Sequence, residues 1–201
     1  NGINAFDRLG TSVSNAGDIN GDGMDDIIIG ANQYNLIGDS REGESYVVFG
    51  RKDGFEGSLN LSEMGDSLGF VINGIDLRDK SGNSVSTAGD VNGDGIDDVI
   101  IGAPYAAPRG NSLAGESYII FGRNDGFGDS LNLSKLDRSQ GFKINGINTQ
   151  DLSGTSVSTA GDINGDGIDD VIIGSPLASP NGVFDAGESY IVFGRTAGFI
   201  D

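Results

Sequence analysis

The sequence predicts an all-β fold made of three consecutive copies of one structural unit. Three nearly identical segments, DINGDGMDD, DVNGDGIDD and DINGDGIDD, begin at positions 18, 90 and 162, so they recur every 72 residues. Each is followed by a short apolar run rich in Ile and Val, and short β-branched runs closed by glycine indicate strands. The 35 glycines among 201 residues suit tight turns between many short strands better than helices.

The first two strands of each repeat are expected to flank the acidic segment. Val13, Val85 and Val157 alternate with serine and other small residues, which indicates a tightly packed innermost strand. The acidic segment is followed by DDIIIGA, DDVIIGA or DDVIIGS, which is apolar on both faces. A strand of this kind is expected to be covered on each side.

The third and fourth strands follow in the same 72-residue register. The third is predicted at 44–50, 116–122 and 188–194, and the fourth at 69–75 and 141–147. Phe142 and Ile144 alternate with Lys143 and Asn145, so we expect a half-exposed outer edge where the lysine discourages further pairing. The leucine-rich links at 59–61 and 131–133 fit either a short extra strand or a turn of helix.

Four strands per repeat, with small residues innermost and a half-polar outermost strand, predict blades of a β-propeller. We divide the chain into repeats at 1–75, 76–147 and 148–201, the last of which stops before any counterpart of the fourth strand. Three blades are fewer than the about four to eight of most propellers. The chain is therefore expected to be half or a fragment of a six- or seven-bladed propeller, and a homodimer could close a six-bladed ring.

Each acidic segment carries oxygen-bearing side chains at its positions 1, 3, 5 and 9. Such a loop can wrap a hard cation such as Ca²⁺, which takes oxygen ligands, and its two glycines permit the tight turn. An EF-hand would need Glu at position 12, where Ile29, Ile101 and Ile173 stand instead, so position 9 must supply the last carboxylate. With a backbone carbonyl at position 7, the predicted ligands of three Ca²⁺ ions are Asp18, Asn20, Asp22, Met24, Asp26, Asp90, Asn92, Asp94, Ile96, Asp98, Asp162, Asn164, Asp166, Ile168 and Asp170.

A polar turn without metal is the alternative, because Asn-Gly and Asp-Gly pairs are ordinary turn signals. Against it, three carboxylates at the ligand positions of nine residues repel one another unless a cation lies between them. Calcium loops without the final Glu are expected to bind weakly, at about 10⁻⁴ to 10⁻³ M. That affinity matches extracellular calcium and predicts a location outside the cytoplasm.

Composition argues against several function classes. With 30 acidic and 12 basic residues, the chain has a net charge of −18, which disfavours nucleic acid as a partner. No stretch approaches the roughly 20 apolar residues of a membrane-spanning helix. Histidine and cysteine are absent and no serine has a base partner nearby in a known pattern, so we expect no enzymatic activity.

Phe-Gly at 49–50, 121–122 and 193–194, together with Gly-Ala-Pro at 102–104, resembles the FG-GAP repeat of integrin α-subunit propellers. In that family a calcium loop lies between the first and second strands, as the acidic segments do here. The sequences at 30–32 (GAN) and 174–176 (GSP) depart from Gly-Ala-Pro. The long and nearly identical copies look most similar to repeats of bacterial surface and secreted proteins. The resemblance implies a calcium-stabilised module for binding or adhesion at the cell surface or outside the cell.

The connections between the second and third strands, at 32–43, 104–115 and 176–187, differ most among the repeats. They should emerge on the face opposite the calcium loops, and loops on a rigid scaffold often carry binding. For these loops, the alternative is neutral variation of a surface. For the function as a whole, the alternatives are a non-catalytic propeller part of a larger secreted hydrolase or lyase, or a structural surface-assembly protein. Integrins likewise bind ligands on the face away from their metal loops. The candidate contacts for a protein or glycan ligand are Tyr34, Arg41, Tyr105, Arg109 and Phe184.

Overall fold

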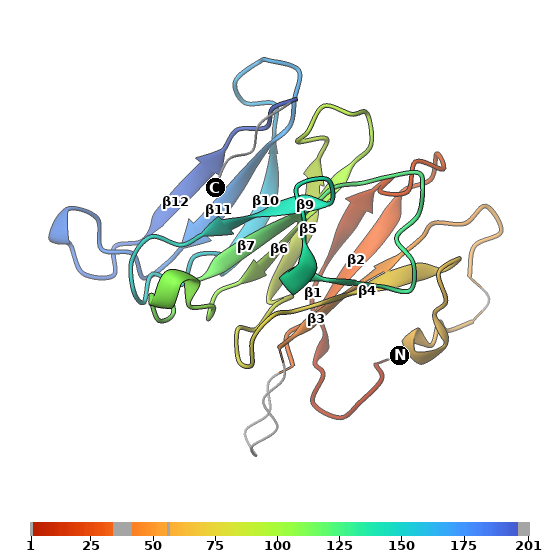
Figure 1. The fold of residues 1–201 in the computed structure, drawn as a ribbon, viewed down its shortest axis with the longest axis horizontal. Coiled ribbons are helices and arrows are strands. Elements are labelled where there is room, and N and C mark those ends of the chain that lie inside the picture. The colour runs from red at the N-terminus through yellow and green to blue at the C-terminus, as the bar shows by residue number, and fades with distance from the viewer. Residues whose placement is uncertain (1, 34–41, 56, 197–201) are drawn as a thin grey trace.

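The computed structural model describes residues 2–33, 42–55 and 57–196, which form three β-sheets lying side by side (Figure 1). Blade 1 contains β1 (Leu9–Gly17), β2 (Asp26–Ala31), β3 (Glu44–Val48) and β4 (Gly69–Asn73). Blade 2 contains β5 (Ser84–Gly89), β6 (Asp98–Ala103), β7 (Glu116–Ile120) and β9 (Gly141–Asn145). Blade 3 contains β10 (Ser156–Gly161), β11 (Asp170–Ser175) and β12 (Glu188–Val192). The predicted all-β class is confirmed.

Each blade is an antiparallel meander in which consecutive strands pair, and the register repeats from blade to blade. Val13 pairs with Ile29, Val85 with Ile101 and Val157 with Ile173. The first strand of each blade ends in a register shift immediately before the acidic segment. Such a shift increases the local bend of the strand, and here it directs the chain into the loop that follows.

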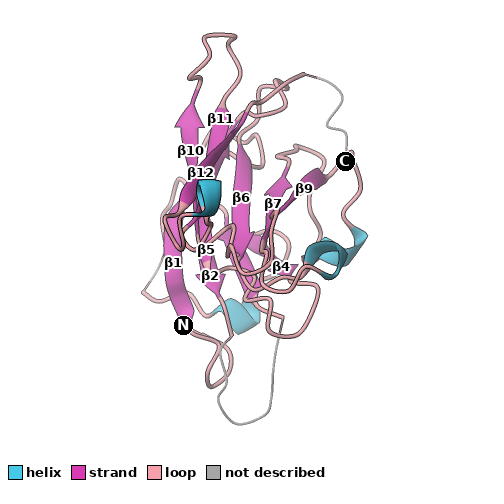
Figure 2. Ribbon diagram, turned by 90° about the vertical axis from the view of Figure 1, so that its left-hand side faces the viewer, coloured by secondary structure: helices cyan, strands magenta, loops and turns pink. Residues whose placement is uncertain are grey.

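The first strands lie innermost, as expected from their small residues. β1 lies beside β5, and β5 lies beside β10, so the three sheets meet along these strands. Figure 2 shows the strands of successive blades stacked across the molecule. Ala16 and Ala88 on β1 and β5 are fully buried, because only small side chains fit where neighbouring blades approach closely.

The hydrophobic core lies between the blades. One cluster joins Ile19, Ile28 and Val47 of blade 1 to residues of blade 2, and a second joins Val91, Ile100 and Ile119 of blade 2 to residues of blade 3. The expectation that the second strand is covered on both faces is correct only for blade 2, where every residue of β6 is buried. β2 and β11 keep exposed positions because blades 1 and 3 each have a single neighbour in the described chain.

The leucine-rich links take both forms that the sequence allowed. The first forms a 3₁₀ turn, η1 (Leu61–Glu63), and the second forms β8 (Ser130–Asn132) followed by η3 (Leu133–Lys135). β8 does not join its own blade, because it pairs in parallel with β4 and adds a fifth strand to the sheet of blade 1. The outer edge of blade 2 is β9, where Lys143 forms an ion pair with Glu116 at 3.1 Å, so the lysine lies on an edge strand as expected.

Helix in the described chain is limited to four single turns, which are η1, η3, η2 (Pro108–Gly110) and η4 (Pro180–Gly182). Among the described residues, no helix has the length and hydropathy needed to cross a membrane.

Candidate metal centre

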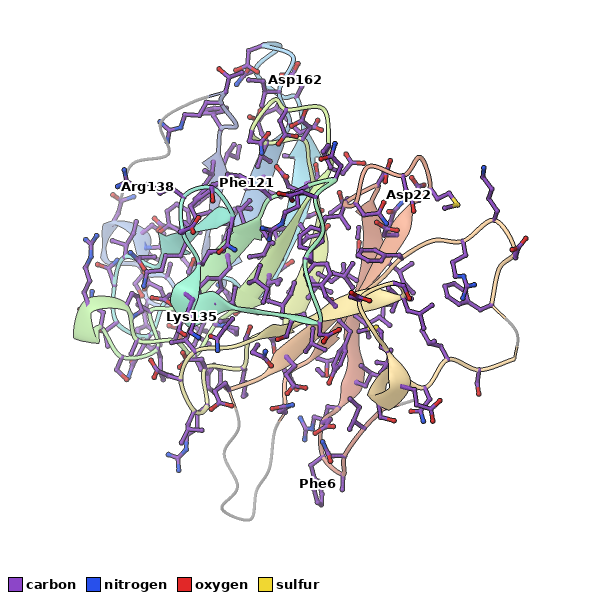
Figure 3. All side chains as sticks on the ribbon, turned by 45° about the vertical axis from the view of Figure 1, so that its right-hand side comes forward. Phe6, Asp22, Phe121, Lys135, Arg138 and Asp162 are labelled. Carbon is purple, nitrogen blue, oxygen red and sulfur yellow. The ribbon has the colours of Figure 1, made fainter. Side chains whose placement is uncertain are left out.

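The three acidic loops connect the first and second strands of each blade and lie at one end of the molecule. Figure 3 shows Asp22 of the first loop and Asp162 of the third at this end, and Phe6 at the other. Antiparallel pairing makes this arrangement necessary, because the β1–β2, β5–β6 and β10–β11 connections all leave the sheets in the same direction.

Each loop is wound around the carboxylate of its first residue. Asp90 accepts hydrogen bonds from the backbone N–H groups of Gly93 at 2.7 Å, Asp94 at 3.0 Å and Gly95 at 2.8 Å. Asp162 repeats this pattern, and the hydrogen bonds from Gly167 and its neighbours lower the pKa of its carboxyl. The tight winding requires a positive φ at the two glycines, which is +73° at Gly93 and +88° at Gly95.

The side chains at positions 3 and 5 continue the turn. In the second loop, Asn92 Oδ1 accepts a hydrogen bond from the N–H of Asp94 at 2.8 Å, and Asp94 Oδ1 accepts one from Ile96 at 3.0 Å. The same bonds occur in the other two loops. Each of these oxygens has a second lone pair, so a hydrogen bond to the backbone does not exhaust its capacity as a ligand.

The carboxylate at position 9 is buried in all three loops. Asp98 is inaccessible to solvent, and its two oxygens accept hydrogen bonds from Val91 N–H at 3.0 Å and Gly122 N–H at 2.8 Å. Burial raises the pKa of Asp98 to about 8 and that of Asp26 to about 6, although the hydrogen bonds act in the opposite direction. A nearby cation would favour the charged form of such a group.

The glycine of each Phe-Gly pair is the partner of this buried carboxylate. Gly50, Gly122 and Gly194 donate to Asp26, Asp98 and Asp170, respectively, at 2.7, 2.8 and 3.0 Å. A Cβ at Gly122 would lie 2.3 Å from the carbonyl oxygen of Asp97, so only glycine fits there. Sequence reasoning used Phe-Gly as a family marker and missed this structural role, which its occurrence 24 residues after each buried aspartate could have suggested.

The donor set of each loop fits a hard cation in its chemistry. It offers side-chain oxygens at positions 1, 3 and 5, a carbonyl at position 7 and a buried carboxylate at position 9, and Ca²⁺ prefers oxygen ligands of these kinds. Within the described residues, however, no three His, Cys, Asp or Glu side chains converge as a metal-binding group. The carboxylates instead accept hydrogen bonds from backbone N–H groups, those of their own loop and, at position 9, also that of the Phe-Gly glycine. The fifteen ligands therefore remain a prediction.

A further aspartate, at position 8, ties the second and third loops to the preceding blade. Asp97 Oδ2 of blade 2 accepts a hydrogen bond from the N–H of Asp18 of blade 1 at 2.9 Å. Asp169 of blade 3 does the same for Asp90 of blade 2 at 3.0 Å. Sequence analysis did not single out these residues, because their partners lie in another repeat.

The variable connections emerge at the end opposite the acidic loops. Tyr34 and Arg41 lie outside the described residues. Tyr105 is exposed, and the Lys80 ammonium lies 3.6 Å from the centre of its ring. Arg109 helps to line a groove of 430 Å³ whose walls also include Lys143, Phe142 and Arg195, whereas Phe184 is highly exposed and lies outside that groove. The structure does not gather Tyr105, Arg109 and Phe184 into one pocket.

The glutamate that begins each third strand has a structural partner. The hydroxyl groups of Tyr46, Tyr118 and Tyr190 donate to Glu44, Glu116 and Glu188, respectively. Burial, followed by the nearby Glu116 charge, raises the pKa of the Tyr118 hydroxyl. The tyrosine therefore stays protonated and remains a donor to this carboxylate.

Comparison with known families gives a match to the FG-GAP repeat over residues 9–48, 81–120 and 153–192. The chain belongs to the FG-GAP repeat family. The three matched segments each run from the first strand through the acidic loop to the third strand, and the blades are those of an integrin-α-like propeller.

Among curated proteins, the chain is similar to parts of much longer ones. It is 35% identical to integrin alpha-4 of Xenopus laevis over 164 residues, which is 81% of the chain and 14% of that protein. It is 32% identical to integrin alpha pat-2 of Caenorhabditis briggsae over 79% of the chain and 12% of that protein. It is 29% identical to phosphatidylinositol-glycan-specific phospholipase D of Bos taurus over 92% of the chain and 21% of that protein. The chain thus spans between 12% and 21% of the length of these relatives.

Proposed function

We propose that these FG-GAP blades form a calcium-stabilised, non-catalytic binding module that works at the cell surface or outside the cell. The observation that carries the proposal is the buried aspartate at position 9, which recurs in all three loops. A buried carboxylate is costly to ionise without a compensating charge. A Ca²⁺ ion held by the same loop would supply that charge.

Calcium would act on stability and not on chemistry. The ion would draw the carboxylates of Asp90, Asp94 and Asp98 together with the amide of Asn92 and the carbonyl of Ile96, and likewise in the other loops. Each loop joins the two innermost strands of its blade, so fixing the loop also fixes that hairpin. Because the folded loop binds the ion and the unfolded chain does not, binding stabilises the fold by mass action.

The first experiment is thermal unfolding of the chain in calcium and in EGTA. With a dissociation constant of about 10⁻⁴ to 10⁻³ M and free calcium at about 10 mM, each loop should contribute about 1 to 3 kcal/mol, and the melting temperature should rise by on the order of 10 °C. A triple variant with Asp22, Asp94 and Asp166 each replaced by Ala should lose this response. Asp66→Ala, an exposed aspartate outside the loops, is the matched control. Equal melting temperatures in calcium and EGTA would refute the calcium proposal.

The binding face is proposed at the end opposite the acidic loops, with a protein or glycan as ligand. Support comes from the exposure of Tyr105, Arg109 and Phe184 on connections that differ among otherwise similar repeats. The similarity to integrin α subunits points the same way. Replacing Arg109 and Phe184 with Ala should weaken capture on protein or glycan arrays without changing the melting temperature.

The similarity to phosphatidylinositol-glycan-specific phospholipase D supports a second candidate. On this proposal the blades are the non-catalytic propeller part of a larger secreted hydrolase or lyase, with the chemistry elsewhere in that protein. The two candidates differ in an assay of the chain itself. Phosphodiester or glycan cleavage by the isolated chain would contradict both, whereas inactivity with ligand capture on arrays favours the first.

A further inference from the structure

The acidic loops are connected to one another across both blade boundaries. Asp18, at position 1 of the first loop, donates its backbone N–H to Asp97 Oδ2 of the second loop at 2.9 Å. Asp90, at position 1 of the second loop, donates its N–H to Asp169 Oδ2 of the third loop at 3.0 Å. Position 8 of one loop therefore holds position 1 of the loop in the preceding blade.

Position 1 is the residue around which each loop is wound, so a bond to its backbone acts on the whole loop. In the first loop, the Asp18 carboxylate accepts hydrogen bonds from the N–H groups of Asp22 at 2.9 Å and Gly23 at 2.8 Å. The Asp97 side chain thus fixes the backbone of a residue whose carboxylate is both the centre of the loop and a predicted calcium ligand.

The residue that precedes position 1 is fitted to this contact. A Cβ at Gly17 would overlap the Asp97 carboxylate, and a Cβ at Gly89 would overlap the Asp169 carboxylate. Only glycine lets the aspartate of the following blade reach the N–H group. The same fit occurs at both boundaries, so the contact belongs to the repeat and not to one blade.

A second connection runs through the backbone and joins the buried carboxylates at position 9. Ile19 donates its N–H to Asp26 Oδ2 at 3.1 Å, and its carbonyl accepts the N–H of Arg123 at 2.9 Å. Arg123 follows Gly122, whose N–H donates to Asp98 Oδ1 at 2.8 Å. Two short backbone segments therefore link the position 9 carboxylates of the first and second loops.

The same backbone connection recurs between the second and third loops. Val91 donates its N–H to Asp98 Oδ2 at 3.0 Å, and its carbonyl accepts the N–H of Arg195 at 2.9 Å. Gly194, which precedes that arginine, donates its N–H to Asp170 Oδ1 at 3.0 Å. Val91 is only 1% exposed, so water does not compete for these bonds.

We propose that the calcium loops are coupled, so that calcium in one loop raises the calcium affinity of the loop in the preceding blade, with Asp97 and Asp169 as positioning residues. The inference rests on the calcium proposal above. Position 8 lies between the predicted ligands at positions 7 and 9 of its own loop, so closing that loop around an ion holds the aspartate in place. The preceding loop then has its first residue already ordered and loses less conformational entropy on binding.

Repulsion between neighbouring ions acts against this coupling. Repulsion is screened over about 8 Å at an ionic strength of about 0.15 M, whereas the hydrogen bonds that join the loops are partly or fully buried. We therefore expect the net effect to be favourable at this ionic strength. Couplings between sites commonly change affinity about 5- to 150-fold, and they are reciprocal.

The test is a calcium titration followed by ¹⁵N–¹H NMR, in which the glycine amides of each loop report that loop separately. Asp94→Ala removes a predicted ligand of the second loop, and we expect it to raise the titration midpoint of the first loop about fivefold or more. Asp97→Ala should raise the same midpoint to a similar extent. Asp97→Asn removes the charge but keeps an oxygen acceptor for the Asp18 N–H, so this midpoint should stay within about twofold of the wild type. Asp66→Ala, outside the loops, is the surface control and should change no midpoint.

A double variant decides whether Asp97 transmits the effect. If it does, Asp94→Ala and Asp97→Ala together should raise the first-loop midpoint by clearly less than the product of their single effects, because the second substitution removes a connection that the first has already weakened. Calcium-free spectra show whether each variant remains folded, and Asp94→Ala changes only an exposed loop side chain.

Two outcomes would overturn the coupling and leave the calcium proposal standing: a first-loop midpoint that Asp94→Ala does not raise, or single effects that simply multiply in the double variant. Calcium titration without a shift of any loop glycine would refute both proposals.

Discussion

Blades 2 and 3 have almost the same strand sequences but different surroundings. β6 (DVIIGA) is buried at every residue, whereas β11 (DVIIGS) exposes Ile172, and β7 (ESYII) is buried throughout whereas β12 (ESYIV) is exposed at alternate positions. The strand register is the same in both. Local sequence therefore sets the shape of a blade, and its neighbours set how much of it is buried.

The two larger buried clusters lie between the sheets. A single blade has two apolar faces and cannot cover either by itself, which is a general property of repeat architectures. Blade 2 has both faces covered by blades 1 and 3. Equivalent substitutions in blades 2 and 3 should consequently have unequal costs, and the difference measures what a neighbouring blade contributes.

The largest contrast is expected between Ile100→Ala and Ile172→Ala. Ile100 is inaccessible to solvent at the boundary of blades 2 and 3, so truncation leaves a cavity and should cost about 2 to 5 kcal/mol. Ile172 is 36% exposed at the same position of blade 3, so its loss should cost less than about 1.5 kcal/mol in the monomer. Urea unfolding at a concentration below self-association gives both values. Equal costs would mean that the neighbour adds nothing to the burial of this position.

Much of the fold could be predicted from the sequence because the signals were local and repeated three times. The 72-residue period gave three blades, and alternation and β-branched runs gave the strands, including the edge position of Lys143. The same repetition placed the acidic loops between the first and second strands. Strand patterns of this kind depend only on a few neighbouring residues.

What the sequence could not show depends on partners in another repeat. β8 lies in the second repeat but pairs with β4 of the first, and nothing within Ser130–Asn132 indicates that choice. Asp97 looks like one more acidic residue of its loop, yet it binds the N–H of Asp18 in the preceding blade. The uneven burial of Ile100 and Ile172 likewise arises from the arrangement of blades and not from the strand sequence.

A smaller contrast is expected between Asp97→Ala and Asp25→Ala. Both are at position 8, but Asp97 accepts a hydrogen bond across a blade boundary and Asp25 is exposed without such a bond in the described chain. Hydrogen bonds to a charged group contribute about 1.5 to 3 kcal/mol, and less where water competes. We expect a cost of about 1 to 2 kcal/mol for Asp97→Ala and below about 0.5 kcal/mol for Asp25→Ala. Chemical unfolding measures both, and a larger cost for Asp25→Ala would contradict a stabilising role for the hydrogen bond between Asp97 and Asp18 N–H.

The smallest effect is expected in the pH dependence of stability, at a position that is Asn in the first and third repeats and Asp in the second. Asp7 and Asp151 accept hydrogen bonds from the backbone N–H of Asn4 at 2.6 Å and of Asn148 at 3.3 Å, and Asp151 accepts a further one from the side-chain amide of Asn148 at 3.1 Å. The second repeat has Asp76 at the position of these asparagines, opposite Asp79. Burial, with added repulsion from Asp76 and Glu116, raises the pKa of Asp79 to about 6.

A carboxyl whose pKa is higher in the folded protein than the unfolded value of about 3.9 favours folding most when it is protonated. The contribution of Asp79 should therefore be complete below about pH 4 and disappear as the pH rises through about 6. Asp26 and Asp98 change stability in the same direction. The part of the pH dependence that belongs to Asp79 is therefore obtained by comparing a variant with the wild type. Asp76→Asn should restore the arrangement of the other repeats and make stability less dependent on pH between about 4 and 7, whereas Asp66→Asn should leave the slope unchanged. Unfolding midpoints measured across this range in EGTA, where no cation compensates Asp26 and Asp98, test the assignment, and identical slopes for wild type and Asp76→Asn would show that Asp76 does not control this titration.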